Sequence, residues 1–106
     1  HNSYGHMMAK ATYEGLVERD QGELRPFVLS RSVFIGSQKY GAKWTGDNQA
    51  SYDEPGVYKL IAVVEHNGVA FVGADIPGFY GKPTDELYVL FYQLGVFYPF
   101  TRAHSH

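Results

Sequence analysis

The spacing of apolar residues predicts a helix near the start of the chain. Within His6–Arg19, small and apolar residues recur at roughly helical spacing, at Met8, Ala11, Gly15 and Leu16. Ser3 is a suitable N-cap, because its hydroxyl can accept a hydrogen bond from a free N–H of the first turn. Gly22 is a suitable end, because glycine readily adopts the left-handed conformation that stops a helix.

A second helix is predicted with a more regular pattern. Its apolar residues are spaced i, i+3, i+4 and i+7, at Leu87, Leu90, Phe91 and Leu94. Pro83 suits the first helical position, and the acidic Asp85 and Glu86 favour the positive end of a helix dipole. Gly95 is the expected end of this helix.

Shorter apolar runs predict strands. Pro26–Phe34 is rich in β-forming residues and is expected to be a strand whose first half is buried on both faces. Val96–Thr101 is expected to be a final strand, with Pro99 at an edge or at the strand start. Gly36–Asn48 contains three glycines among polar and aromatic residues and is expected to be a long irregular loop. Two further β-rich runs flank the Asn67-Gly68 turn signal, so residues 57–76 are predicted to form a hairpin.

Composition narrows the class of protein. With 106 residues the chain is expected to be one domain, 1–106, and it is too short for a complete eight-stranded α/β barrel of about 250 residues. The net charge of −2, without a run of Lys and Arg, argues against nucleic acid or an anionic membrane as a partner. The sequence has no Cys, no cofactor fingerprint and no G-x-S-x-G or H-E-x-x-H motif, so we expect no cofactor.

Asp47 is a candidate acid catalyst. It follows Gly46 and lies three residues after Trp44, the only Trp of the chain. A carboxyl group against an apolar ring has a raised pKa, which a general acid near neutral pH requires. The alternative is that Asp47 caps a helix or shapes a turn.

Other polar residues stand at predicted strand ends. Asp75 follows an apolar run, where α/β folds place their sites, although an Asx-turn would explain it equally well. Arg31 interrupts an apolar strand, so it either faces a cleft or forms a structural ion pair. His104 and His106 could bind a metal, but no third ligand is evident, and the alternative is that they belong to a disordered terminus.

Five segments together resemble the second half of the catalytic barrel of glycoside hydrolase family 31. In chain order they are Arg25–Ser32, Gly36–Ala42, Trp44–Asn48, Gly73–Phe79 and Tyr98–His104. The resemblance implies an α/β fold that is part of a (β/α)8 TIM barrel, roughly strands six to eight with flanking helices. Residues Pro55–Val69 do not match the family pattern.

The resemblance also implies residue roles. Asp47 would be the general acid/base of a retaining α-glucosidase. Arg31, Phe79 and His104 would bind the sugar in the reacting subsite, and we include Trp44 and Asp75 among the substrate-binding candidates. The family nucleophile lies in a W-x-D-M-N-E block, which this chain lacks, so we expect the chain alone to be inactive.

Within the family, the sequence is most like the α-glucosidases that trim glucose from N-glycans in the endoplasmic reticulum. This implies a luminal parent protein, an α-glucoside substrate and a regulatory β subunit as a possible partner. Two alternatives remain open at this point: a non-catalytic sugar-binding chain and a purely structural one.

Overall fold

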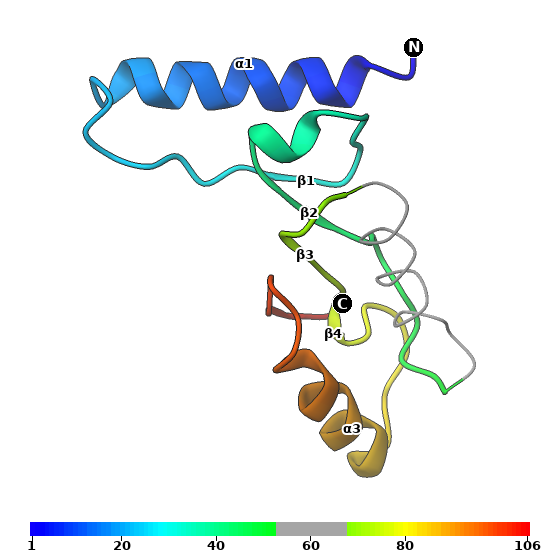
Figure 1. The fold of residues 1–106 in the computed structure, drawn as a ribbon. Helices are drawn as coiled ribbons and strands as arrows, with labels where there is room; N and C mark the ends of the chain where they lie inside the picture. The colour runs from blue at the N-terminus through cyan, green and yellow to red at the C-terminus, as the bar shows by residue number, and fades with distance from the viewer. Residues whose placement is uncertain (53–67) are drawn as a thin grey trace.

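The computed structural model describes residues 1–52 and 68–106, which form short parallel strands between two helices (Figure 1). In chain order the elements are α1 (Tyr4–Arg19), β1 (Leu29–Ser30), the 3-10 helix η1 (Ser37–Lys39), β2 (Ala42–Trp44), β3 (Val72–Gly73), β4 (Ile76–Pro77), α3 (Asp85–Gly95) and β5 (Ala103–His104). Helix α1 lies at one end of the molecule and α3 at the other (Figure 1).

Strands β1, β2 and β3 form one parallel sheet in that order. Leu29 pairs with Ala42, and Trp44 pairs with Gly73. The prediction of an irregular loop over Gly36–Asn48 is therefore wrong for Ala42–Trp44, which is the central strand. A strand of three residues is too short to show a recognisable sequence pattern. This strand is defined by its pairing with β1 and β3.

Strands β4 and β5 form a second parallel pair, with Ile76 opposite Ala103. The final strand was expected over Val96–Thr101, and this is wrong, because that segment turns. The Thr101 hydroxyl donates to the Gly95 carbonyl at 2.6 Å. Val96 and Phe97 are 72% and 81% exposed, and Tyr98 is the residue of this apolar run that joins the core.

The prediction of a helix after Pro83 is confirmed, with a later start. The helix begins at Asp85, and the Thr84 side chain caps it by accepting a hydrogen bond from the Leu87 N–H at 3.2 Å. Pro83 thus precedes the cap. Leu87 and Phe91 are buried, whereas Leu90 is 44% exposed and lies off the buried face.

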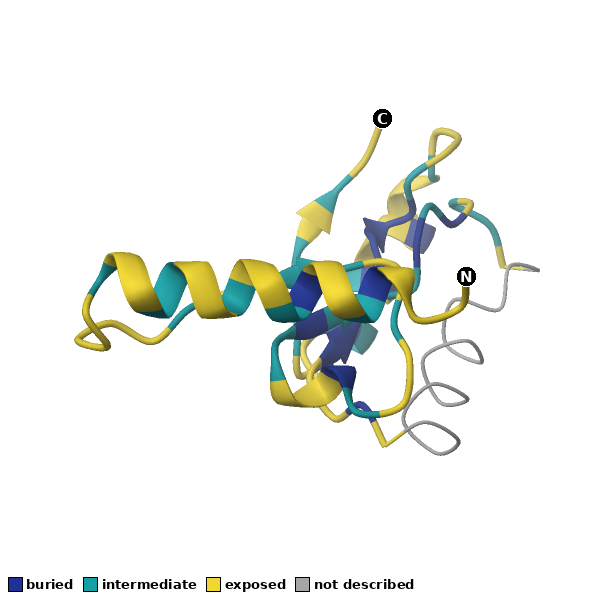
Figure 2. Cartoon of the chain, turned by 90° about the horizontal axis from the view of Figure 1, so that it is seen from above, coloured by how far each residue is buried: buried dark blue, intermediate teal, exposed yellow. Residues whose placement is uncertain are grey.

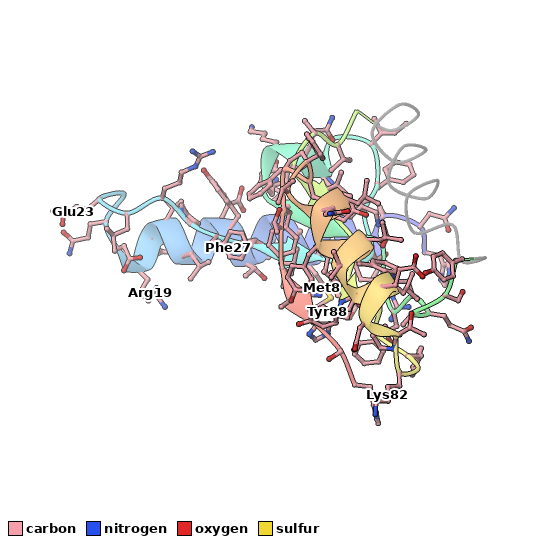
Figure 3. All side chains as sticks on the ribbon, turned by 90° about the horizontal axis from the view of Figure 1, so that it is seen from below. Met8, Arg19, Glu23, Phe27, Lys82 and Tyr88 are labelled. Carbon is pink, nitrogen blue, oxygen red and sulfur yellow. The ribbon has the colours of Figure 1, made fainter. Side chains whose placement is uncertain are left out.

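Helix α1 has its buried residues in its first half, and Tyr13 in its second half contacts the Tyr40 ring. It begins two residues before the predicted start, and Ser3 is its N-cap residue without a side-chain hydrogen bond. Its buried residues, Gly5 and Ala9, belong to the first two turns, and the rest of the helix is largely exposed (Figure 2). Arg19 and Glu23 mark the end that projects away from the strands (Figure 3).

The main core lies between α3 and the strands. Its buried members are Val69, Val72, Ala74, Ile76, Leu87, Phe91 and Tyr98. A separate aromatic trio gathers just before three of the strands, where Phe27 lies 6.2 Å from Phe71 and 6.0 Å from Phe100, measured between ring centroids. Phe27 is 59% exposed, so the expectation that this segment is buried on both faces holds for Val28 and is wrong for Phe27.

The described strands pair in parallel and leave the sheet open. The first arm of the hairpin predicted for residues 57–76 lies outside the described residues, together with Asn67 of its turn. The second arm contains β3, and β3 pairs in parallel with β2. The α/β class is confirmed, as part of a parallel arrangement and not a closed barrel.

Candidate active site

Arg31 and Asp47 meet at the carboxyl ends of β1 and β2. Arg31 directly follows β1, and Asp47 lies three residues after the end of β2. Because these strands are parallel neighbours, both residues emerge at the same edge of the sheet. Arg31 Nη1 lies 3.6 Å from Asp47 Oδ2, and the two side chains are 59% and 25% exposed. An ion pair with this exposure contributes at most about 1 kcal/mol, so it orients the two groups more than it stabilises the fold.

Asp75 forms a second, more buried pair. Its side chain has no exposed surface, and its Oδ1 accepts a hydrogen bond of 2.7 Å from Arg102 Nη2. Asp75 Oδ2 is buried without a hydrogen-bond partner in the described parts of the chain. A buried carboxylate next to a guanidinium is held as an ion pair, because an isolated charge in the interior is costly.

Trp44 lies beside the same arginine. The Arg102 guanidinium carbon stands 5.4 Å from the Trp44 ring centroid and 5.6 Å from that of Phe100. At these separations a cation is attracted to the ring faces. Arg102 therefore links the end of β2 to the Asp75 carboxylate. That the Trp44 ring shields the Asp47 carboxyl group from water stays a prediction.

Phe79 and His104 are in ring contact. Their centroids are 5.2 Å apart, and the rings are tilted by 33°. The His106 ring also lies near Phe79, at 6.0 Å, and the His106 N–H donates to the Phe79 carbonyl at 2.9 Å. The expectation of a disordered C-terminal segment is therefore wrong here, because β5 and this hydrogen bond hold it.

Asn48 connects these groups. Its side chain is buried and donates to the Asp75 carbonyl at 3.3 Å. Its own carbonyl accepts from the Phe79 N–H at 2.8 Å and from the Tyr80 N–H at 2.9 Å. The loop that carries Asp47 is thus bonded directly to the loop that carries Phe79. All six predicted site residues end a strand or follow one closely.

The described residues offer no assembled metal centre. No group of three or more His, Cys, Asp or Glu side chains in residues 1–52 and 68–106 is arranged to hold a metal ion. Within the same ranges, no helix is long and apolar enough to cross a membrane.

Comparison with known proteins identifies the family. A family model described as "Glycosyl hydrolases family 31 TIM-barrel domain" matches residues 1–106. The chain belongs to glycoside hydrolase family 31. The family 31 assignment confirms that the open parallel strands are part of a TIM barrel, whose sites lie at the carboxyl ends of the strands.

Relatives within family 31 are close over the whole chain. A "Probable glucan 1,3-alpha-glucosidase" of Arabidopsis thaliana is 50% identical over 107 residues, which cover 100% of this chain and 12% of that protein. A solved structure described as glucosidase II alpha subunit in an "alpha3-Glc2-bound" form is 44% identical, with a TM-score of 0.87 over 98% of this chain and 12% of that one.

A further solved structure contains two subunits. It is described as an "ER glucosidase II heterodimeric complex consisting of catalytic subunit and the binding domain of regulatory subunit". It is 44% identical to this chain, with a TM-score of 0.87, and the match covers 99% of this chain and 12% of that one. The chain thus spans about an eighth of the length of these relatives.

Sequence reasoning missed three residues that contact the candidate site residues: Arg102, Asn48 and Lys43. Arg102 could have been found, because a carboxylate at the end of an apolar run needs a cation nearby. Asn48 and Lys43 carry no such signal, because each donates to a main-chain carbonyl, a group that every residue has.

Proposed function

We propose that the protein carrying this chain is a retaining α-glucosidase that removes terminal α-linked glucose from oligosaccharides. Family membership and the α-glucosidase names of the relatives support the reaction class. The observation that carries the proposal is the Arg31 and Asp47 pair at the carboxyl edge of parallel strands. There the pair is accessible to a sugar.

In this mechanism Asp47 is the proton donor. It protonates the glycosidic oxygen as the bond to the anomeric carbon breaks, and a carboxylate nucleophile forms the glycosyl-enzyme. Asp47 then takes a proton from the attacking water, which releases glucose with its configuration retained. The two carboxyl groups must be about 5–5.5 Å apart. Because the W-x-D-M-N-E block of the family nucleophile is absent from these 106 residues, the proposal takes the nucleophile from another part of the protein.

The other site residues are proposed to bind the glucose unit. Arg31 would donate hydrogen bonds to sugar hydroxyls, and Trp44 and Phe79 would offer apolar ring surface. His104 would hydrogen-bond a hydroxyl from its place beside Phe79. Asp75 would contribute to binding indirectly, by its ion pair with Arg102, because its own carboxylate is buried.

The substrate and setting of the whole protein follow from its relatives. We propose N-glycan trimming in the lumen of the endoplasmic reticulum, with a regulatory β subunit as partner. The two-subunit structure similar to this chain supports that proposal.

The acid role of Asp47 can be tested in the full-length protein. Asp47→Asn should lower turnover of an unactivated α-glucoside by about 10²–10⁴-fold. An aryl α-glucoside with a very acidic leaving group needs little protonation, so the variant should retain much of its first step there. Added azide, which needs no general base, should restore turnover of that substrate and yield the α-glycosyl azide. Wild-type activity that survives Asp47→Asn on all substrates would contradict the proposal.

A non-catalytic sugar-binding role is the second candidate, because the nucleophile block is absent from this sequence. It predicts that the full-length protein binds a glucose-like iminosugar and turns over no α-glucoside. Calorimetric titration beside the activity assay separates the two functions. For the 106 residues alone, we expect no turnover.

A further inference from the structure

Arg31 is held at two points. Its guanidinium faces Asp47, as described above, and its main-chain carbonyl accepts a hydrogen bond from Lys43 Nζ at 2.6 Å. Lys43 belongs to β2, whereas Arg31 lies just beyond β1. The hydrogen bond therefore ties the backbone of the sugar-binding candidate to the neighbouring strand.

The absence of a side chain at Gly46 leaves room for the Arg31 guanidinium. A Cβ at this position would lie 2.8 Å from Arg31 Nε and 2.9 Å from Nη2, so the side chain of Arg31 passes directly over the bare Cα. Gly46 also has a φ of +89°, which favours glycine. Arg31 is thus contacted at its backbone by Lys43 and at its guanidinium by Gly46 and Asp47.

We propose that Lys43 is a positioning residue for Arg31 and that it sets the affinity of the site for the sugar. This inference rests on the proposed function, because Arg31 must contact the sugar for its orientation to matter. Lys43 itself does not need to touch the substrate.

The electrostatics argue that Lys43 is more than a surface charge. Burial, and secondarily the positive charge of Arg31, lower the pKa of the Lys43 amine. A second cation next to Arg31 therefore carries an energetic cost that an apolar residue in this strand would avoid. The short hydrogen bond from a charged donor offsets that cost, since such bonds are about twice as strong as neutral ones.

The test is Lys43→Met in the full-length protein. We expect KM for an aryl α-glucoside to rise by about tenfold, with kcat changed much less, and the Kd of a glucose-like iminosugar to rise in parallel, as loss of one charged hydrogen bond would give. Lys43→Arg keeps a charged donor and should recover most of the loss. Lys10→Met, which breaks only a surface pair with Glu14, is the matched control and should leave both constants unchanged.

The outcomes separate positioning from packing. If Lys43→Met lowers the melting temperature while KM and the iminosugar Kd stay at wild-type values, the inference is overturned. If Lys43→Met does not fold, Lys43→Leu removes the donor in the same way, and unchanged KM and Kd would again overturn the inference. A wild-type protein that neither hydrolyses the glucoside nor binds the iminosugar would instead refute the proposed function.

Discussion

Arg102 Nη2 donates to Asp75 Oδ1 across 2.7 Å, and the Asp75 side chain is entirely enclosed. The pair joins residues 27 positions apart along the chain, one after β3 and the other just before β5. Because the Arg102 guanidinium also lies over the Trp44 ring, this pair connects two of the candidate site residues, Asp75 and Trp44.

Loss of the Arg102 charge should be more harmful than loss of the whole pair. Arg102→Met leaves an unpaired carboxylate in the interior and should lower the free energy of unfolding by about 3 kcal/mol. Adding Asp75→Asn removes the stranded charge, so the double variant should recover part of that loss. Urea unfolding of the three proteins measures the difference. Equal midpoints for Arg102→Met and the wild type would show that the pair contributes nothing.

Two glycines should respond in opposite directions to alanine. A Cβ on Gly73 would overlap the Phe100 carbonyl, so Gly73→Ala should destabilise the protein by about 1–3 kcal/mol. Gly15 lies within α1, and no atom of the described residues lies within 4 Å of where its Cβ would be, so Gly15→Ala should stabilise by about 0.5–1 kcal/mol. Thermal melts of both variants test the close approach of Phe100 to β3, and a neutral Gly73→Ala would contradict it.

Tyr98→Phe should stabilise the protein. The Tyr98 hydroxyl is buried and has no hydrogen-bond partner in the described residues, so removing it should gain about 1 kcal/mol. Burial also raises the pKa of Tyr98 above its ordinary value near 10. The unfolded chain therefore releases this proton first, and the wild type should lose stability as pH rises from about 10 toward the higher folded pKa.

The pH dependence of unfolding, compared between Tyr98→Phe and the wild type, is the control for this prediction. Tyr98→Phe should lack the part of the alkaline loss that Tyr98 causes, which chemical unfolding near pH 9 and near pH 11 would show. A variant less stable than the wild type at pH 7 would mean that the hydroxyl has a partner.

Phe79 and His104 should act as a unit in sugar binding. Phe79→Leu keeps the backbone hydrogen bond to Asn48 and removes the ring that contacts His104, so the Kd of an iminosugar should rise about 3- to 10-fold. His104→Ala should weaken binding as well, and the double variant should lose less than the sum of the two effects. Titration calorimetry provides all four affinities. Strict additivity would mean that the ring contact plays no part.

The sequence predicted those elements whose signal is local. Helix α3 was recognisable because its apolar spacing and its acidic first turn lie within a dozen residues. Strand β2 was not, because Ala42–Trp44 is a strand only through partners on β1 and β3. The apolar run Val96–Thr101 misled in the opposite sense, since hydrophobic composition does not say that a segment is buried.

The candidate site shows the same division. Asp47 and Arg31 were proposed from their motifs, and their ion pair is consistent with the parallel pairing of β1 and β2. Lys43 and Asn48 act through main-chain atoms of distant loops, and a sequence motif does not encode which carbonyl a side chain reaches. Groups that bond main-chain atoms are thus harder to predict from sequence than the side chains that stand in a motif.

The Asn48 carbonyl, which accepts two amides from the segment after β4, has a practical consequence for engineering. The loop that carries Asp47 and the loop that carries Phe79 are bonded to each other, so replacing only one of them with the loop of another barrel would break these hydrogen bonds. Substrate preference in this region should therefore be redesigned by exchanging both loops together.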